Sequence, residues 1–297
     1  MTSNLAPVLR VHKVSKSFGR NQVLRDVTVE AMTGQVIGLL GRNGTGKTTL
    51  FRLVHDLLEP DEGTIEVLGE RLDGSGKVRA MTGHLPDRPQ FHARWTPRNI
   101  LKWRARLVPN FSLERAVRWA SGLGLDLDRK WWRPSVGQAC KLGWVCACAH
   151  LPKLVLLDEP TNGLDYAARN YALHTLLPEL CTAGATVIVA NHHMREVALL
   201  LTDIWLVRDR TLCTVGSGVS KERFRASGLI SLPLPAGVPE PVRSDGRYAV
   251  WLLNEVEFGL LAQSCVVVGL EREPASPEDQ MAALLRELES PNASPAQ

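Results

Sequence analysis

The fold is decided by the segment Gly41-Arg42-Asn43-Gly44-Thr45-Gly46-Lys47-Thr48-Thr49, which has the pattern G-x-x-x-x-G-K-[ST]. It follows Val36-Ile37-Gly38-Leu39-Leu40, a short apolar run typical of a strand buried on both faces. The pattern predicts a strand, a glycine loop and a helix that begins near Lys47. Because glycine tolerates positive φ, successive backbone N–H groups of this loop can converge on phosphate oxygens at the positive end of that helix.

The side chains of this segment suit a nucleoside triphosphate with Mg²⁺. Lys47 would reach the β- and γ-phosphates, and the Thr48 hydroxyl would ligate the metal ion. The alternative is a glycine turn beside an ordinary surface lysine, which we disfavour because a chance match in a chain of this length is rare. The residues that we assign to nucleotide binding here are Gly41, Asn43, Gly44, Thr45, Gly46, Lys47, Thr48 and Thr49.

A second segment carries two carboxylates at the end of an apolar run. Leu154-Val155-Leu156-Leu157 is followed directly by Asp158-Glu159-Pro160, which places both acidic residues at the carboxyl end of a buried strand, beside the phosphate loop of a doubly wound sheet. Phosphoryl transfer depends mainly on positioning and on charge neutralisation. We therefore assign Asp158 to the Mg²⁺ shell and Glu159 to polarisation of the attacking water.

Composition bounds the class of protein. The 297 residues are 44% hydrophobic, enough to bury a core and to form two domains or one large domain with an appendage. The net charge of +4 permits contact with nucleic acid or an anionic membrane but argues for neither. The 6 cysteines lack zinc-site spacing, so we expect reduced and mostly buried thiols. With no apolar run near the ~18 residues of a membrane span and no apolar leader, we expect neither a span nor a cleaved signal.

The pattern along the chain predicts an α/β fold. Apolar and polar residues alternate between Val8 and Ala31, as in short antiparallel strands. Helical periodicity runs from Thr96 to Leu125, with Ser112 at the position of an N-cap. Strands at 154–157 and 185–190 flank a helix predicted over 166–181, and this order indicates a parallel sheet covered by helices.

The helical stretch is rich in arginine and tryptophan. This combination can mark a surface that binds single-stranded nucleic acid, but solvated helix faces above an aromatic core explain it more often. We therefore expect a charged helical insert with tryptophans in its core, and no nucleic-acid partner. The tryptophans are Trp95, Trp103, Trp119, Trp131 and Trp132.

Taken with the phosphate loop, three further segments resemble the nucleotide-binding subunit of an ATP-binding cassette (ABC) transporter. Residues 156–165, Leu-Leu-Asp-Glu-Pro-Thr-Asn-Gly-Leu-Asp, resemble a Walker B strand that runs into the D-loop of that family. Pro134-Ser135-Val136-Gly137-Gln138 resembles the signature segment, and it ends 20 residues before Asp158, as the family spacing expects. Ala190-Asn191-His192 resembles the switch-histidine loop, and the whole resemblance covers about residues 8–217.

The resemblance implies roles for residues outside the phosphate loop. Ser135, Gly137 and Gln138 would contact the ATP held by a second subunit, and His192 would sense the γ-phosphate. Phe18 would stack on adenine, and Asp87 would ligate Mg²⁺ through water, with Gln90 as a fallback for that role. His192 can instead be a structural histidine, and we assign no role to its neighbour His193.

Two positions depart from the family pattern. Pro134 and Val136 replace the usual leucine and first glycine of the signature segment, and a β-branched residue restricts a backbone that would otherwise approach the γ-phosphate. Asp87 stands where the family usually has glutamine, a feature of the branch that powers export. We expect binding across the dimer to survive the first departure, with a weaker affinity than is usual in the family.

The resemblance also implies an architecture and partners. We expect residues 1–218 to form a P-loop ATPase core with a parallel sheet, an antiparallel β subdomain and a helical subdomain at about 89–141. Residues 219–297 would form a small α+β accessory domain with a frayed tail. ATP with Mg²⁺ would close a head-to-tail dimer, preferably of two copies of this chain but with a heterodimer left open, at the cytoplasmic face of the plasma membrane. A separate integral membrane permease would dock near residues 87–96 and export a small molecule, a peptide or a lipid-like substrate.

Three other classes compete with this interpretation. A soluble ABC ATPase that remodels nucleic acid or ribosomes usually has paired cassettes or long inserts, whereas this chain has one cassette and a compact insert. A regulatory module without catalysis is favoured only by Val136, and Glu159 and His192 argue against it. A P-loop kinase has no reason to hold the signature and D-loop segments.

Overall fold

The computed structural model describes residues 6–190, 197, 200–215, 222–227, 243–244, 248–253 and 269–273. The chain forms two compact units, one of Met1–His193 with Leu201–Val215 and one of Met194–Leu200 with Gly216–Gln297. Each unit is described by itself. The helices of the described residues include none that is both long and apolar enough to cross a membrane.

An antiparallel sheet opens the first unit. Its strands β1 (Leu9–Phe18), β2 (Asn21–Ala31), β4 (Glu62–Val67) and β5 (Glu70–Arg71) lie in the order β2-β1-β4-β5. The alternation predicted this sheet, because Leu9 and Val11 are fully buried while Arg10 and His12 are exposed. The predicted antiparallel subdomain is confirmed.

A six-stranded sheet forms the centre of the unit, in the order β10-β9-β3-β8-β7-β6. Every residue of the central strands β3 (Val36–Leu40), β7 (Leu154–Asp158) and β8 (Thr186–Ala190) is buried, as expected of parallel strands covered on both faces. Neighbouring strands are parallel except at the edge, where β10 (Thr211–Val215) runs antiparallel to β9 (Asp203–Arg208). The remaining strand is β6 (Thr82–Leu85), at the other edge.

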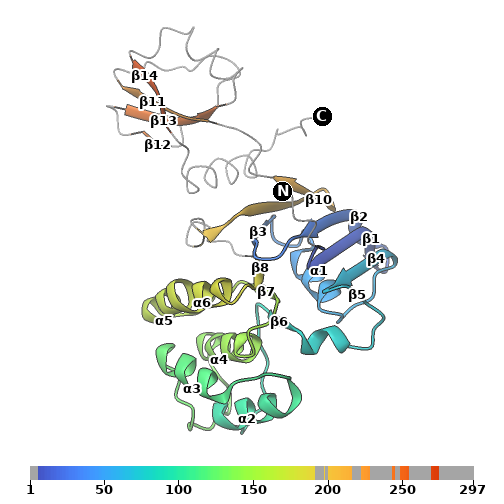
Figure 1. Ribbon diagram of the computed structural model, residues 1–297, viewed down its shortest axis with the longest axis vertical. Helices are drawn as coiled ribbons and strands as arrows, with labels where there is room; N and C mark the ends of the chain where they lie inside the picture. Colours follow the sequence, from blue (N-terminus) through green and yellow to red (C-terminus); the bar gives the residue numbers. More distant parts are fainter. Residues whose placement is uncertain are drawn as a thin grey trace. The chain divides into compact units, whose positions relative to one another are not determined.

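The helices of the first unit begin where the sequence predicts. Helix α1 (Lys47–Val54) follows the glycine loop, and α2 (Pro97–Leu107) and α3 (Leu113–Gly122) are capped by the hydroxyls of Thr96 and Ser112. With α4 (Val136–Cys148) they gather away from the antiparallel sheet, in the green part of the ribbon in Figure 1. The predicted helix at 166–181 is present as α5 (Tyr166–Tyr171), the π-helical turn η2 (Ala172–Leu176) and α6 (Leu177–Thr182). A short 3₁₀ helix, η1 (Lys77–Ala80), precedes β6.

The five tryptophans of the helical segment differ in burial, and Trp95 is half-buried. Trp119 and Trp131 are buried, as expected for core residues of α3 and of the loop before α4. Trp103 and Trp132 are not, with 47% and 67% of their surface exposed. The prediction that the tryptophans lie in the core is therefore wrong for these two residues. Helix α2 turns Pro97, Ile100 and Leu101 inward and leaves Trp103 on its outer face.

The second unit contains an antiparallel sheet in the order β12-β13-β11-β14. Its strands are β11 (Glu222–Ser227), β12 (Arg243–Ser244), β13 (Tyr248–Leu253) and β14 (Gly269–Glu273). The strand predicted over 248–253 is confirmed. The strand predicted over 265–270 overlaps β14 only at its last two residues, 269 and 270. The predicted linker at 232–241, the helix start at 276–279 and the frayed tail lie outside the described residues.

Candidate functional site

The phosphate loop connects β3 to α1 through a glycine that no other residue can replace without strain. Gly46 precedes the helix at φ 108°, and a Cβ atom there would lie 2.9 Å from side-chain atoms of both Val23 and Leu24. Its carbonyl accepts the first hydrogen bond of the helix, from the N–H of Leu50 at 2.8 Å. The loop is therefore fixed between the antiparallel sheet and α1, with the N-terminal N–H groups of the helix facing the loop.

Lys47 is held by the loop itself. Its ammonium donates to the carbonyl oxygens of Gly41 at 2.6 Å and Arg42 at 3.1 Å, and only 9% of the residue is exposed. Burial lowers the pKa of Lys47 from its usual value, against the opposing field of Glu159 and Asp158. A phosphate is a stronger acceptor than a carbonyl, so this ammonium is positioned to bind one.

Thr48 and Asp158 form an oxygen pair beside Lys47. The Thr48 hydroxyl donates to the Asp158 carboxylate at 2.7 Å, and Asp158 is 3% exposed at the end of β7. Burial, with a smaller contribution from Asp87, raises the pKa of Asp158, so a cation here would stabilise its ionised form. A hydroxyl and a carboxylate suit Mg²⁺, which takes its other ligands from phosphates and water. The described residues hold no cluster of three or more His, Cys, Asp or Glu that would bind a metal without a nucleotide.

Glu159 leaves the strand in a left-handed backbone conformation. Its φ is 50°, and its N–H donates to the carbonyl of Ala190 at 2.7 Å, which ties the end of β7 to the end of β8. Strained backbone of this kind is common where a side chain must be aimed. Ala190 is the last residue described before the predicted switch loop, and His192 and His193 lie outside the described residues.

Asp87 is positioned by a residue that the sequence did not single out. It follows β6, and it accepts a hydrogen bond from the Asn162 amide at 2.9 Å and pairs loosely with Arg88 at 3.6 Å. The sequence signal that could have identified Asn162 is its position within residues 156–165, which resemble the Walker B strand and the D-loop. Gln90, the fallback for Asp87, is exposed.

A cavity of about 300 Å³ collects most of the predicted nucleotide-binding residues. Phe18, at the end of β1, is 48% exposed there, with the Lys16 ammonium 5.9 Å from its ring centroid. Gly41 and Thr45 belong to the loop but do not line the cavity, and Val23 lines it without having been predicted. The lining residues are Phe18, Val23, Asn43, Gly44, Gly46, Lys47, Thr48, Thr49, Asp87, Asp158 and Glu159.

The signature segment lines a different cavity, of about 370 Å³. Ser135 caps α4, and its hydroxyl and the Gln138 side chain bond reciprocally to each other's backbone N–H groups at 3.2 and 2.9 Å. A Cβ atom on Gly137 would collide with the carbonyl oxygen of Gly163 in the D-loop. The ion pair of Lys141 and Asp165, at 2.6 Å, also lines this cavity. Ser135, Gly137 and Gln138 thus lie together but apart from the phosphate-loop cavity.

Val136 does not distort this segment. It is the first residue of α4, in a helical conformation that valine adopts readily, and its side chain lies against Gly163. Val136 has no positive φ, and whether it restricts the approach of the backbone to the γ-phosphate stays a prediction.

Comparison with known proteins places this site in a family. Residues 24–162 match the family model described as ABC transporter. The chain is 33% identical over 207 residues to the uncharacterized ABC transporter ATP-binding protein YdbJ of Bacillus subtilis (strain 168), covering 68% of this chain and 67% of the relative. It is 31% identical over 222 residues to the lipopolysaccharide export system ATP-binding protein LptB of Acidithiobacillus ferridurans, covering 72% of this chain and 91% of the relative.

A third relative is the Nod factor export ATP-binding protein I of Sinorhizobium fredii (strain NBRC 101917 / NGR234), 34% identical over 241 residues that cover 78% of this chain and 67% of the relative. Among solved structures, an ATP-binding subunit of an ABC transporter aligns with a TM-score of 0.62 and 25% identity over 70% of this chain and 90% of that one. These similarities agree with the geometry of the phosphate loop and of the Asp158 strand end. The chain therefore belongs to the ABC transporter family, as an ATP-binding subunit whose ATP hydrolysis is coupled to transport.

Proposed function

We propose that this chain powers a separate integral membrane permease by ATP-driven closure of a head-to-tail dimer, and that the cargo leaves the cell. Support for export comes from relatives whose names describe lipopolysaccharide export and Nod factor export. Asp87, in place of the usual glutamine, supports the same branch. The cargo would be a small molecule, a peptide or a lipid-like substrate.

The observation that carries the proposal is the separation of the two cavities. Lys47 and Thr48 line one, whereas Ser135 and Gly137 line the other. A nucleotide held by the phosphate loop therefore needs a signature segment from another chain to enclose it. Because ATP can favour closure only through contacts that the open state lacks, the γ-phosphate would act as the link between the two subunits.

Each residue then has a defined task. Lys47 would exchange the carbonyls of Gly41 and Arg42 for β- and γ-phosphate oxygens, and Phe18 would stack on adenine. Thr48 and Asp158 would hold Mg²⁺, with Asp87 contributing through water, and the bound metal ion neutralises charge on the phosphates. Glu159 would orient and polarise the attacking water. His192 would contact the γ-phosphate.

The partners follow from the same model. A permease would dock near residues 87–96 and hold the chain at the cytoplasmic face of the plasma membrane. The second nucleotide-binding subunit would be another copy of this chain, with a sister subunit as the alternative. Residues 1–218 would act as the ATPase domain, with a helical subdomain at about 89–141, and residues 219–297 as a small accessory domain. Purification from native membranes, followed by identification of the polypeptides that accompany the chain, tests these assignments.

The dimer model is tested with Glu159→Gln. This variant keeps the phosphate loop but loses the carboxylate that would orient water. It should therefore bind ATP, hydrolyse it at least about 100-fold more slowly and accumulate as a dimer. Light scattering during size exclusion, with ATP and Mg²⁺, measures the association. The double variant Glu159→Gln with Ser135→Arg should bind ATP and remain monomeric, whereas Ser121→Arg, at an exposed serine of α3, should not prevent association. A monomeric Glu159→Gln protein saturated with ATP contradicts the model.

A further inference from the structure

A ridge of aromatic and basic side chains on the helical segment takes no part in the ATP site. Trp95 and Trp103 stack with centroids 5.9 Å apart, and the Arg106 guanidinium lies 5.6 Å from the Trp103 ring centroid. The Arg94 guanidinium lies 4.9 Å from the ring centroid of Trp132. We call this set the tryptophan–arginine ridge; it consists of Arg94, Trp95, Trp103, Arg106, Leu107 and Trp132.

The ridge is continuous because a backbone hydrogen bond joins the two loops that contribute to it. The N–H of Arg94 donates to the Trp131 carbonyl at 2.7 Å, so the loop before α2 lies beside the loop before α4. On α2, Trp103 and Leu107 are one helical turn apart and lie on the same face. Leu107 and Trp132 are each 67% exposed. Large apolar side chains that are exposed together on one surface often mark an interaction site.

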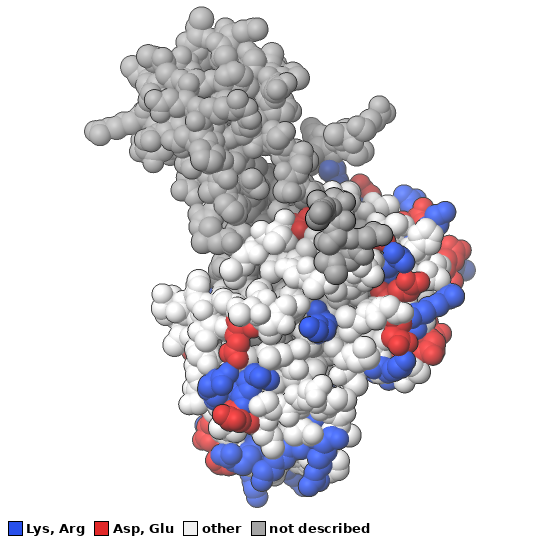
Figure 2. Space-filling model, viewed as in Figure 1, with Lys and Arg blue, Asp and Glu red and all other residues white. Residues whose placement is uncertain are grey.

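The surroundings of the ridge are strongly basic. Residues 88–133 contain 11 Lys and Arg but only 3 Asp and Glu, in a chain whose net charge is +4. Figure 2 shows Lys and Arg gathered at the lower edge of the first unit, where Figure 1 places α2 and α3. The positive charge is therefore concentrated on this segment, and the rest of the chain is on balance acidic.

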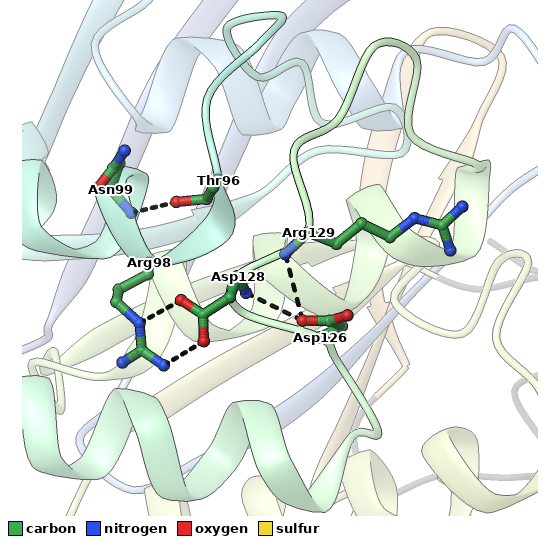
Figure 3. Close-up of polar contacts among 6 residues, drawn as sticks. All are labelled: Thr96, Arg98, Asn99, Asp126, Asp128 and Arg129. Atoms are coloured by element: carbon green, nitrogen blue, oxygen red, sulfur yellow. Dashed lines mark hydrogen bonds and ion pairs between the residues drawn. The ribbon is translucent and has the colours of Figure 1, made fainter.

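Two of the three acidic residues of this stretch, Asp126 and Asp128, bond to groups within the segment. Asp128 accepts two hydrogen bonds from the Arg98 guanidinium, at 2.7 and 2.8 Å, and this pairing lowers the pKa of Asp128. Asp126 accepts the backbone N–H groups of Asp128 and Arg129, while the Arg129 guanidinium extends away from it (Figure 3). Among the described residues, Lys102, Arg129, Lys130 and Arg133 make no ion pair. All four of these residues are exposed to solvent.

We propose that the tryptophan–arginine ridge binds the surface of a membrane that contains anionic phospholipids. Tryptophan rings favour the headgroup region of a bilayer, and arginine and lysine extend from an apolar surface toward phosphates. Charge complementarity favours an anionic surface over a neutral one. Single-stranded nucleic acid is a poorer fit, because the bases need free aromatic faces and arginine already covers one face of Trp103 and of Trp132. Arg94 and Trp95 lie at the end of the segment 87–96 that we assign to the permease, so the membrane proposal depends mainly on Trp103, Leu107 and Trp132 and on the basic residues around them. The proposal does not depend on ATP.

The test is flotation of the full-length chain with lipid vesicles. Vesicles of phosphatidylcholine with about 30% phosphatidylglycerol should bind the chain at least about tenfold more tightly than vesicles of phosphatidylcholine alone. Raising the salt from about 50 mM to about 500 mM should weaken this binding, because the charges are exposed. The variant Arg94→Gln with Lys102→Gln and Arg106→Gln should lose the preference for anionic vesicles. Replacing Trp103, Leu107 and Trp132 by alanine should lower binding at every salt concentration.

A matched control removes the same charge elsewhere. Lys13, Arg20 and Arg71 are exposed on the antiparallel sheet, and their replacement by glutamine should leave vesicle binding unchanged. Every ridge variant and the matched control should still bind ATP, which shows that they are folded. Lys47→Ala, in contrast, should lose ATP binding but keep vesicle binding. The proposal is overturned if both vesicle types bind the chain equally, if the ridge variants bind as the unaltered chain does, or if single-stranded DNA displaces the chain from vesicles at concentrations where inorganic phosphate does not.

Discussion

The phosphate-loop region and the helical segment differ in how their polar groups are satisfied. Around the loop, the ammonium of Lys47 and the hydroxyl of Thr48 bond to partners in the same region, and the flanking strands β3 and β7 are entirely buried. On the helical segment, Ser135 and Val136 are exposed, as are Trp103 and Trp132. The polar groups of Lys47 and Thr48 thus have partners within one chain, whereas the helical segment presents exposed surfaces that other molecules would cover.

The largest effect is expected from Lys47→Ala, which removes the one buried ammonium of the phosphate-loop cavity among the described residues. Loss of charge-assisted hydrogen bonds to two phosphates should weaken ATP binding by on the order of 100-fold or more. Calorimetric titration with ATP and Mg²⁺ measures the change. Lys77→Ala removes an exposed lysine that pairs with Glu70, and it should leave the affinity unaltered. Near-normal binding by Lys47→Ala would show that the first region is not the nucleotide site.

The first region could be predicted from the sequence because its signals are local. The apolar run at 36–40, the glycine spacing and the acidic pair after 154–157 each fix a strand end or a helix start within a few residues. The caps at Thr96 and Ser112 are local in the same sense, so the starts of α2 and α3 were also predictable.

What the sequence did not predict depends on segments that meet only in three dimensions. Whether Trp103 or Trp119 is buried is decided by how α2 and α3 pack, not by their neighbours in sequence. The same holds for Asn162, whose amide reaches Asp87 across 75 positions of the chain, and for Val136, which finds room against Gly163. Tertiary packing overrides local pattern at each of these places.

The second prediction concerns three histidines where the two regions join: His55 and His84 are half-buried, and His150 is buried. His55 follows α1, His84 is on β6, and Arg104 extends from α2 to donate to the Cys146 carbonyl of α4 at 2.8 Å. Burial, with a smaller contribution from the charge of Arg104 at His55 and His150, lowers the pKa of His55 to about 3 and the pKa values of His84 and His150 to about 4. All three histidines are therefore neutral in the folded chain near pH 7.

The sign of the pH effect follows from these values. Between pH 6.5 and about 4 the unfolded chain binds protons that the folded chain does not, so the stability that the neutral histidines provide is present above pH 6.5 and is lost as the pH falls. From pH 7 to pH 5 the free energy of unfolding should drop by roughly 2 kcal/mol for each histidine. Urea unfolding measures it. His84→Leu should reduce the slope, since the buried Nε2 atom of His84 has no hydrogen-bond partner among the described residues, whereas His174→Gln, at an exposed site, should not. If the free energy of unfolding does not change between pH 7 and pH 5, the inference that these histidines are neutral in the folded chain is wrong.

A smaller effect is expected from Gly137→Ala, which tests the contact between the signature segment and the D-loop. The added Cβ would collide with the Gly163 carbonyl, so α4 or the D-loop must shift, at a cost of about 1–2 kcal/mol in stability. ATP-dependent association of the Glu159→Gln background should weaken by more than this cost implies, while ATP binding to the monomer stays the same. Gly122→Ala, which would press on the Tyr171 ring in the same unit, provides a control for mere strain. Equal loss of association in both variants would mean that the D-loop contact has no special role.

The smallest effect is expected from Val136→Gly. This substitution distinguishes two explanations for Val136, which stands in place of the first glycine of the family signature. Since position 136 already has a helical backbone, Val136→Gly should cost about 0.5–1 kcal/mol through helix propensity and change the Kd of ATP-dependent association by less than about threefold. Val117→Gly, at an exposed valine inside α3, should cost a similar amount of stability without any effect on association. If Val136→Gly instead tightened the dimer about tenfold or more, the valine would be a brake on closure, and the signature half of the site would be weakened in this chain. The phosphate-loop half would then carry more of the binding than its counterpart, and a partner subunit with an unaltered signature would close on this chain better than a second copy does.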